Sequence, residues 1–314
     1  MTDMRKVAFL FAGQGAQTVG MGRDFADTVP ESGAVFSMGE ALRTGITQIC
    51  FGTGSQMDGA LLGQTANTQP CLFLTDLAIA EAFRAVGLLP AAVAGFSLGE
   101  IPAAAFVGVL SYEEAFRFVL LRAESMAWQS GRHPGGMAAA LKLAPEVVEE
   151  ICSRFSEVWP VNYNCPGQVS CAGSAAEIDD FCAAVRQAGG RAVKLPVSGA
   201  FHTPYMAQVA PVLRAALDGA DVSAPAIPLY ANRTASPYPA DRAGILDCMT
   251  LQVCSPVRWE STLRAMWTAG ITTFVEVGAG HTLTGFVSRT LPEARALTVN
   301  DIPSFEAVCR ELTE

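Results

Sequence analysis

Residues 91–105 read AAVAGFSLGEIPAAA, and this stretch carries the motif that decides the fold. The apolar run Ala91–Ala94 predicts a short buried strand, and the Ala-rich stretch after Gly99 predicts a helix. Residues 95–99 fit the G-x-S-x-G pattern, in which glycines permit a tight turn that exposes the serine at the helix N-terminus. This context favours a nucleophilic Ser97 over an ordinary turn between a strand and a helix.

Two further apolar runs, Lys6–Phe11 and Thr273–Val277, predict buried parallel strands, with helical patterns between them. Ser111 and Glu114 have the spacing of a capping box, and Thr203-Pro204 is typical of a helix start. Strands that alternate with helices indicate an α/β fold. We therefore expect a large α/β-hydrolase-like domain built on a parallel sheet.

The middle of the chain has a different pattern, which we interpret as an inserted subdomain at 131–198. The expected order is βαββαβ, the ferredoxin-like split unit. It consists of a strand at 136–141, a helix from Pro145, strands around Asn162 and Val169, a helix capped by Ser174–Glu177 and ending near Gly189, and a strand at 191–195. Residues 1–130 and 199–314 then form the large domain.

The composition excludes several classes of protein. Of the 314 residues, 50% are hydrophobic and only 16% charged, which argues against a disordered chain. No apolar run reaches the roughly 18 residues of a membrane-spanning helix. A net charge of −9 argues against nucleic-acid binding. The nine cysteines form no C-x-x-C pair, and the apolar run near the N-terminus is too short for a secretory signal, so we expect a cytoplasmic protein.

A serine nucleophile needs a base, and the chain has three histidines. His202 directly precedes a predicted helix, where a loop side chain can project into a cleft. His281 also lies at a predicted helix start, near the C-terminus, where an α/β-hydrolase keeps its base. His133 resembles an exposed loop residue. Sequence position leaves His202 and His281 as alternative bases. The three histidines show none of the spacings typical of zinc ligands.

Two polar residues stand out within apolar surroundings. Gln14 lies between Gly13 and Gly15 at the end of the first predicted strand, where open α/β sheets bind ligands. The segment matches neither a P-loop nor a dinucleotide motif, so no nucleotide cofactor is expected. Arg122 lies in an apolar helical pattern with no carboxylate three or four residues away. It either pairs with an acid on another element, extends to solvent, or binds a substrate carboxylate.

Blocks of this sequence, in this order, resemble the malonyl-CoA:acyl carrier protein transacylase family, whose members load malonyl groups for fatty acid synthesis and also occur within polyketide synthases. The resemblance extends over nearly the whole chain. Its blocks are FAGQGAQ at 11–17, TQP at 68–70, GFSLGE at 95–100, Arg122 before Met126, NCPGQ at 164–168, GAFHTPYM at 199–206, Gln252 before SPVRW at 255–259, and FVEVGAG at 274–280 with LTG at 283–285.

The resemblance implies the reacting groups. Ser97 would be acylated by malonyl-CoA, and His202 rather than His281 would be its general base and acid. Gln14 and the backbone N–H of Leu98 would form the oxyanion hole. The fold that the resemblance implies, with its inserted subdomain, agrees with the fold expected from the sequence pattern.

The resemblance also implies how the acyl group is recognised. Arg122 would bind the free carboxylate of the malonyl group, and Gln69 would line the site. A main-chain carbonyl near Gln252 would orient the histidine, so no triad aspartate is needed. Phe201 matches the malonyl-selecting form of the motif. Phe96 departs from the family, which usually has His before the nucleophile, and this puts fine specificity in question.

The activity that follows is malonyl transfer from malonyl-CoA to the phosphopantetheine thiol of acyl carrier protein through a malonyl-serine, without a cofactor or a metal. Fatty acid biosynthesis is expected, because no neighbouring synthase domain is present. Alternatives are a discrete polyketide acyltransferase, a serine thioesterase or esterase using His281, and a non-enzymatic carrier-protein binding module. Arg191 and Lys194 are candidate contacts for an acidic carrier protein.

Overall fold

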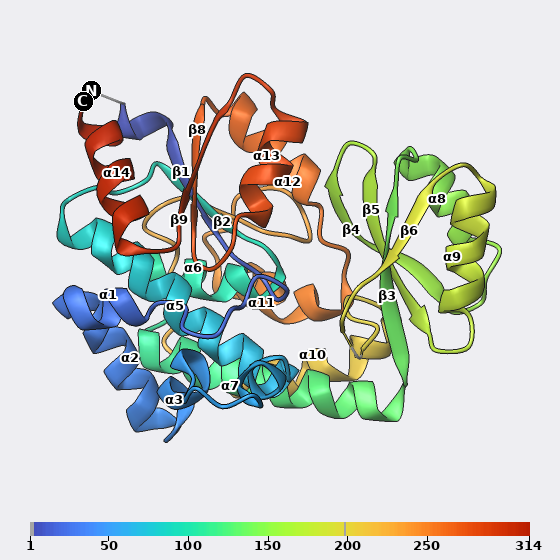
Figure 1. Cartoon of the computed structure of the whole chain (residues 1–314), viewed down its shortest axis with the longest axis horizontal. Coiled ribbons are helices and arrows are strands. Elements are labelled where there is room, and N and C mark those ends of the chain that lie inside the picture. Colours follow the sequence, from blue (N-terminus) through green and yellow to red (C-terminus); the bar gives the residue numbers. More distant parts are fainter. Residues whose placement is uncertain (1–2, 198) are drawn as a thin grey trace.

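Two β-sheets organise the chain in the computed structural model, which describes residues 3–197 and 199–314 (Figure 1). The larger sheet is parallel, with the strand order β7-β2-β1-β8-β9. Its strands are β1 (Val7–Phe11), β2 (Ala92–Gly95), β7 (Leu229–Tyr230), β8 (Thr273–Val277) and β9 (Arg295–Val299). The central position of β1 brings the turns after β1 and β2 next to each other, because parallel strands end at the same edge.

Alternate residues of β1 face different helical layers. Val7, Phe9 and Phe11 belong to the larger hydrophobic cluster, which includes residues of helices α5 to α7. Ala8 and Leu10 instead pack with residues of α12 and α13. All five residues are fully buried. A strand covered on both faces needs apolar residues throughout, which is why this strand was recognisable as a continuous apolar run.

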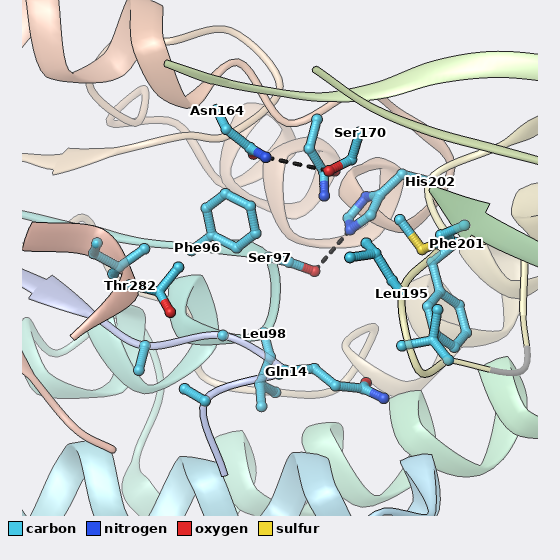
Figure 2. Close-up of a pocket in the computed structure, with 18 of the residues that line it drawn as sticks. Gln14, Phe96, Ser97, Leu98, Asn164, Ser170, Leu195, Phe201, His202 and Thr282 are labelled. Carbon is cyan, nitrogen blue, oxygen red and sulfur yellow. Dashed lines mark hydrogen bonds between the residues drawn. The ribbon is translucent and has the colours of Figure 1, made fainter. Parts of the chain in front are cut away.

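The smaller sheet is antiparallel, with the order β4-β5-β3-β6. Its chain order is β3 (Gly135–Leu141), α8 (Pro145–Cys152), β4 (Val158–Cys165), β5 (Gln168–Ser174), α9 (Ile178–Gln187) and β6 (Arg191–Lys194). One face packs against α8 and α9 around Phe181 and Ile151. The opposite face lines a cavity, into which Asn164 and Ser170 extend (Figure 2).

Helices surround the parallel sheet. The α-helices are α1 (Arg23–Thr28), α2 (Pro30–Leu42), α3 (Ile46–Phe51), α4 (Asp58–Leu62), α5 (Thr65–Ala85), α6 (Glu100–Phe106), α7 (Tyr112–Arg132), α10 (Val209–Ala216), α11 (Arg242–Leu251), α12 (Trp259–Thr268), α13 (Thr282–Thr290) and α14 (Ile302–Thr313). Four short 3-10 helices are η1 (Met4–Lys6), η2 (Ser97–Gly99), η3 (Pro204–Gln208) and η4 (Gln252–Cys254). Within the described ranges, no helix is both long and apolar enough to cross a membrane.

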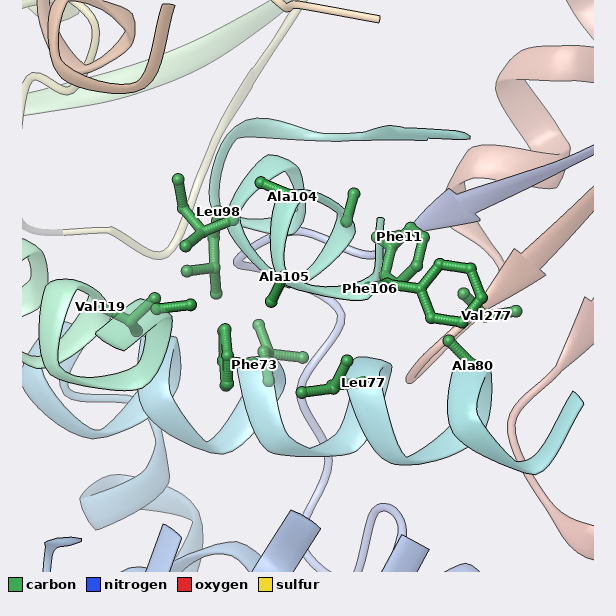
Figure 3. Close-up of a cluster of buried hydrophobic side chains, with 14 of the residues drawn as sticks. Phe11, Phe73, Leu77, Ala80, Leu98, Ala104, Ala105, Phe106, Val119 and Val277 are labelled. Carbon is green, nitrogen blue, oxygen red and sulfur yellow. The ribbon is translucent and has the colours of Figure 1, made fainter. Parts of the chain in front are cut away.

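The core beneath the larger sheet anchors the turn that carries Ser97. Figure 3 shows Leu98 packed in the same cluster as Phe73 of α5 and Val119 of α7. Leu98 is buried, and the rings of Phe11 and Phe106 lie 5.8 Å apart nearby. Burial of a leucine side chain stabilises a fold by about 2 kcal/mol. The residue after Ser97 is therefore fixed by the core.

The predicted fold class is confirmed: a parallel α/β sheet is combined with a smaller ferredoxin-like βαββαβ unit. The sequence pattern missed β7, which has two residues, and β9, whose residues are mostly half-buried. The boundaries at 131 and 198 stay a prediction. Helix α7 continues to Arg132, and Ser198 lies outside the described residues.

Three local expectations about helix starts had different outcomes. The capping box of Ser111 and Glu114 is confirmed at the start of α7. Ser174 does not cap α9, because it belongs to β5 and its hydroxyl is buried without a hydrogen-bond partner among the described residues. Thr203 and Pro204 occupy the N-cap and first positions of η3 as predicted, although the Thr203 hydroxyl donates to the Ala200 carbonyl at 2.7 Å instead of to the helix N-terminus.

Candidate active site

The turn between β2 and η2 holds Ser97 in the left-handed region, with a φ of 52°. This conformation costs a non-glycine residue roughly 1–2 kcal/mol. The flanking glycines are required by close approach, since a Cβ on Gly95 would lie 1.9 Å from the Gly99 carbonyl carbon. Asn232 fixes the turn: its Oδ1 accepts from the Ser97 N–H at 2.7 Å, and its Nδ2 donates to the Gly95 carbonyl at 2.6 Å.

Ser97 and His202 form a hydrogen-bonded pair, with 2.7 Å between Oγ and Nε2. The other ring nitrogen, Nδ1, lies 3.0 Å from the Gln252 carbonyl oxygen and 3.1 Å from that of Ser255. Carbonyl oxygens only accept hydrogen bonds, so Nδ1 carries the ring proton. Nε2 is then the acceptor for the Ser97 hydroxyl. Two main-chain carbonyls thus do the orienting that a carboxylate does in a triad.

The surroundings of His202 keep its imidazole neutral. The ring is buried, and its backbone also has a left-handed φ, of 61°. Burial and then the positive charge of Arg122 lower the pKa of His202 to about 4, while the hydrogen bonds to the two carbonyls oppose the shift. At neutral pH the ring is therefore ready to accept a proton.

Arg122 of α7 is 1% exposed, so it does not extend to solvent. Its Nη1 donates to Gln69 Oε1 at 2.6 Å, and its Nη2 donates to Gln252 Oε1 at 2.9 Å and to Ser97 Oγ at 3.3 Å. In residues 3–197 and 199–314, no acidic side chain forms an ion pair with it, and its Nε has no hydrogen-bond partner. Burial lowers the pKa of Arg122 to about 10, which leaves the guanidinium charged at neutral pH.

The negative charge of Glu100 acts on Arg122, and the Gln252 side chain bridges the two residues. Gln252 Nε2 donates to Glu100 Oε2 at 3.1 Å and to the Ser97 carbonyl at 2.7 Å. The other donors to the Glu100 carboxylate are the Asn232 N–H at 2.8 Å and the Tyr238 hydroxyl at 2.5 Å. Burial raises the pKa of Glu100 to about 7, although these hydrogen bonds oppose it. Glu100 therefore holds Gln252 and Asn232 in position, and among the described residues it forms no ion pair with the Arg122 guanidinium.

Ser97 opens into a cavity of about 320 Å³ between the two sheets. Figure 2 shows the Ser97 and His202 side chains directed at each other. Phe96 and Thr282 lie on one side of Ser97, and Leu195 and Phe201 lie on the other. The cavity is mainly apolar, with polar groups at a few positions, as ligand sites usually are.

Of the eight predicted site residues, seven line this cavity: Gln14, Gln69, Ser97, Leu98, Arg122, Phe201 and His202. Gln252 contacts Arg122 and His202 from outside the lining. The side-chain amide of Gln14 is already engaged, because its Nε2 donates to Thr65 Oγ1 at 3.2 Å.

The other histidines lie elsewhere. His133 is exposed at the end of α7, with its ring stacked 4.9 Å from that of Tyr205. His281 is exposed at the N-cap of α13. Arg191 and Lys194 are exposed on β6, and Lys194 forms an ion pair with Asp179 at 2.5 Å. Over the described ranges, no cluster of three or more His, Cys, Asp or Glu residues could hold a metal ion.

Sequence reasoning missed three residues that build the site. Asn232 has no local signal, because it follows a two-residue strand and contacts Ser97 across 135 positions. Glu100 was visible as the last residue of GFSLGE, but nothing in the motif revealed its burial. Ser255 contributes only a main-chain carbonyl, which any residue type could supply.

A strained serine on a strand-to-helix turn, a neutral histidine bonded to it and a buried arginine beside both define a serine enzyme for acyl transfer. The Acyl transferase domain model matches residues 8–310, and the chain belongs to that family. It is 33% identical to the malonyl CoA-acyl carrier protein transacylase of Bacillus subtilis, over 99% of this chain and 98% of the relative.

Solved structures agree with this assignment. The malonyl-CoA:acyl carrier protein transacylase from Xanthomonas oryzae pv. oryzae matches with a TM-score of 0.92 and 32% identity, over 99% of both chains. A malonyl-transacylase in complex with a type II PKS acyl-carrier protein matches with a TM-score of 0.92 and 29% identity, over 98% of this chain and 99% of that one.

Proposed function

We propose that this protein transfers the malonyl group from malonyl-CoA to the phosphopantetheine thiol of acyl carrier protein, in fatty acid biosynthesis. The observation that carries the proposal is the buried guanidinium of Arg122, charged, without a carboxylate partner among the described residues, and 3.3 Å from the Ser97 hydroxyl. The names of the relatives support the same substrate pair.

In the first half-reaction, His202 Nε2 takes the Ser97 hydroxyl proton as Oγ attacks the malonyl thioester carbonyl. The tetrahedral intermediate collapses, the carbon–sulfur bond breaks, and the thiolate of coenzyme A leaves with the proton from His202. The products are malonyl-Ser97 and free coenzyme A. The 2.7 Å hydrogen bond between Ser97 and His202 supports this direct proton transfer.

The oxyanion of that intermediate needs donors at the turn. The Leu98 N–H lies in the first turn of η2, where backbone N–H groups lack intrahelical partners. Thr65 accepts from one of the two N–H bonds of the Gln14 amide, so Gln14 supplies the second donor through its other side-chain N–H or through its main-chain N–H. Such pairs of donors typically contribute about 3 kcal/mol or more to the transition state.

In the second half-reaction, His202 deprotonates the thiol of the carrier's phosphopantetheine arm, and the sulfur attacks the malonyl-Ser97 carbonyl. The ester bond breaks, and Ser97 recovers its proton from His202. Arg122 holds the malonyl carboxylate throughout, which orients the ester and disfavours acetyl groups, since these leave the guanidinium unpaired. The apolar lining, including Phe201, limits water at the ester.

Incubation with malonyl-CoA and holo acyl carrier protein tests the proposal. We expect malonyl carrier protein to form and a malonyl mass to appear on the Ser97 peptide before the carrier is added. Release of free malonate without malonyl carrier protein would indicate a thioesterase instead. Acyl transfer only to a carrier from a polyketide system would place the enzyme in that pathway.

Three further expectations belong to this proposal. The reaction needs neither a cofactor nor a metal, the protein is cytoplasmic, and the chain divides into a large domain of residues 1–130 and 199–314 and a subdomain of residues 131–198. A separate hydrophobic cluster under the smaller sheet supports the division.

A further inference from the structure

Glu100 is a buried acid that takes no direct part in the proposed reaction. Its side chain is fully buried and lies outside the lining of the cavity. The Gln252 amide joins it to Arg122, because Nε2 of that amide donates to Glu100 Oε2 at 3.1 Å and Oε1 accepts from Arg122 Nη2 at 2.9 Å. An isolated buried charge is costly, so the carboxylate and the guanidinium stabilise each other across this amide.

A malonyl carboxylate bound at Arg122 would change the charge of this region. Two carboxylates would then share one guanidinium, and the malonyl carboxylate would be the one in direct contact with it. Burial raises the pKa of Glu100 to about 7, and the positive charge of Arg122 is one of the influences that oppose a larger rise. Since a bound carboxylate offsets that positive charge, the neutral form of Glu100 becomes more favourable.

The hydrogen bonds around Glu100 suit both the ionised and the neutral acid. The Asn232 N–H, at 2.8 Å, and Gln252 Nε2 can only donate, and both contact Oε2. Oε1 instead contacts the Tyr238 hydroxyl at 2.5 Å, which can donate or accept. A proton on Oε1 would therefore be donated to Tyr238, while Oε2 kept its two donors. Glu100 can thus change its charge without moving Asn232 or Gln252.

The other titratable groups around Glu100 and Arg122 each keep one charge state near neutral pH. Burial raises the pKa of the Tyr238 hydroxyl and that of the Cys248 thiol, the latter to about 11, so both stay protonated. Burial also lowers the pKa of Arg122 to about 10 and that of His202 to about 4, so the first stays charged and the second neutral. Of these groups, Glu100 is the one whose protonation a nearby charge would change near neutral pH.

We propose that Glu100 is the counter-charge of Arg122 in the empty site and takes up a proton from solvent when a malonyl carboxylate binds to that arginine. The inference rests on the proposed function. In balanced form, malonyl-CoA, the Ser97 hydroxyl, the Glu100 carboxylate and one proton yield malonyl-Ser97, free coenzyme A and the Glu100 carboxylic acid. Acylation by a neutral acyl group takes up no proton, so the preference for malonyl groups should decrease as the pH rises.

Proton uptake during acylation tests the inference directly. The enzyme is acylated in weak buffer with a pH indicator, by malonyl-CoA or by malonamyl-CoA, a neutral isostere in which an amide replaces the carboxylate. Mass spectrometry of the Ser97 peptide counts the acyl groups. If the malonyl group raises the pKa of Glu100 from about 7 by about one unit, uptake at a pH of about 7.5 is about half a proton per malonyl group. For the malonamyl group we expect none.

Two glutamine variants identify the group that takes up the proton. Glu100→Gln removes the titrating group and should abolish the uptake with malonyl-CoA. Glu276→Gln is the matched control, because Glu276 is a second buried acid whose pKa is raised by burial, and it lines the cavity. Its oxygens accept from the N–H groups of Leu283 at 3.0 Å and Thr284 at 2.7 Å, away from the Gln252 bridge. This variant should keep the uptake.

Tyr238→Phe keeps the test decisive should Glu100→Gln fail to fold. The substitution removes a donor to the Glu100 carboxylate. A hydrogen bond to an ionised acceptor is stronger than one to a neutral acceptor, so its loss favours the neutral acid. We therefore expect the pH range in which malonyl-CoA causes proton uptake to move upwards in this variant.

The outcomes discriminate between the inference and the proposed function. Formation of malonyl-Ser97 without proton uptake would overturn the inference, and so would equal uptake with malonamyl-CoA. Uptake that persisted in Glu100→Gln, or that was lost in Glu276→Gln, would assign the proton to another group. If malonyl-CoA left no malonyl group on Ser97 of the unsubstituted enzyme, the proposed function would itself be wrong, and this inference with it.

Discussion

The polar side chains on the two sides of the cavity differ in how fully they are hydrogen-bonded. On the side of the parallel sheet, Ser97, His202 and Gln252 are joined by hydrogen bonds before any substrate arrives. On the side of the smaller sheet, Asn162 and Asn164 keep acceptor oxygens unpaired among the described residues. The polar groups of the first wall hold one another in place, whereas those of the second wall are only partly satisfied by the fold. Substitutions on the two walls should therefore fail in different ways.

The largest effect is expected from Ser97→Ala on the reactive wall. Without the nucleophile, malonyl transfer should fall by at least about 10³-fold, and no malonyl group should attach to the protein. Quantifying malonyl carrier protein together with intact-protein mass checks both. Ser170→Ala removes another hydroxyl from the same cavity and should keep the covalent label, so a labelled Ser97→Ala enzyme would contradict the assignment.

Arg122→Ala should change the choice of acyl group more than the chemistry. Loss of a buried charged hydrogen bond of about 3 kcal/mol corresponds to roughly 10²-fold in kcat/KM for malonyl-CoA. Acetyl-CoA, which has no carboxylate, should be affected far less, so the ratio of the two constants is the measurement. If both substrates lost activity equally, Arg122 would not be a carboxylate clamp.

Phe96→His restores the residue that the family usually has and should act mainly on stability. The Phe96 ring meets that of Trp259 edge-on, with centroids 5.4 Å apart. Such aromatic pairs contribute about 1 kcal/mol, so the melting temperature should fall by about 2 °C. Malonyl transfer should stay within about threefold, because Asn232 holds the turn independently. A tenfold change in rate would instead give Phe96 a direct part in the reaction.

The smallest effect is expected from acidification. Only the neutral imidazole accepts the Ser97 proton, so the rate follows its neutral fraction. With a pKa of His202 of about 4, roughly 90% of the rings are neutral at pH 5, whereas an ordinary histidine with a pKa near 6.5 would be only about 3% neutral. Titration of His202 should thus change kcat/KM for acylation less than twofold between pH 7 and pH 5. Glu100, with a pKa raised to about 7, also titrates in this range, so the profile is measured in Glu100→Gln as well. An inflection near pH 6.5 that persists in Glu100→Gln would contradict the assigned surroundings of His202.

The sequence was most informative where chemistry and local backbone shape coincide. Ser97 was predicted because glycines at both flanks and a strand before it are signals within nine residues. The alternation of strand and helix also predicted the parallel sheet and the βαββαβ unit. His202 could not be separated from His281 by spacing, because its pairing with Ser97 spans 105 positions and depends on the folded chain.

Prediction failed where a residue acts through tertiary contacts alone. The Ser174–Glu177 pattern has the spacing of a capping box, but pairing of β5 with β3 withdraws Ser174 into the sheet. For Arg122, spacing left an ion pair, solvent and a substrate carboxylate as alternatives, and only the burial of its side chain excludes solvent. Asn232 and the Ser255 carbonyl contact Ser97 and His202 only because the folded chain brings them there, and no local sequence pattern indicates such contacts.

Main-chain hydrogen bonds join β4 to the segment around Val257. The Val257 N–H donates to the Val161 carbonyl at 2.8 Å, and the Tyr163 N–H donates back to Val257. Displacement of the smaller sheet away from this segment would break both bonds. The main chain thus couples β4 to the segment whose Ser255 carbonyl lies against the His202 ring, so a substitution that shifts one of them would also be felt at the other.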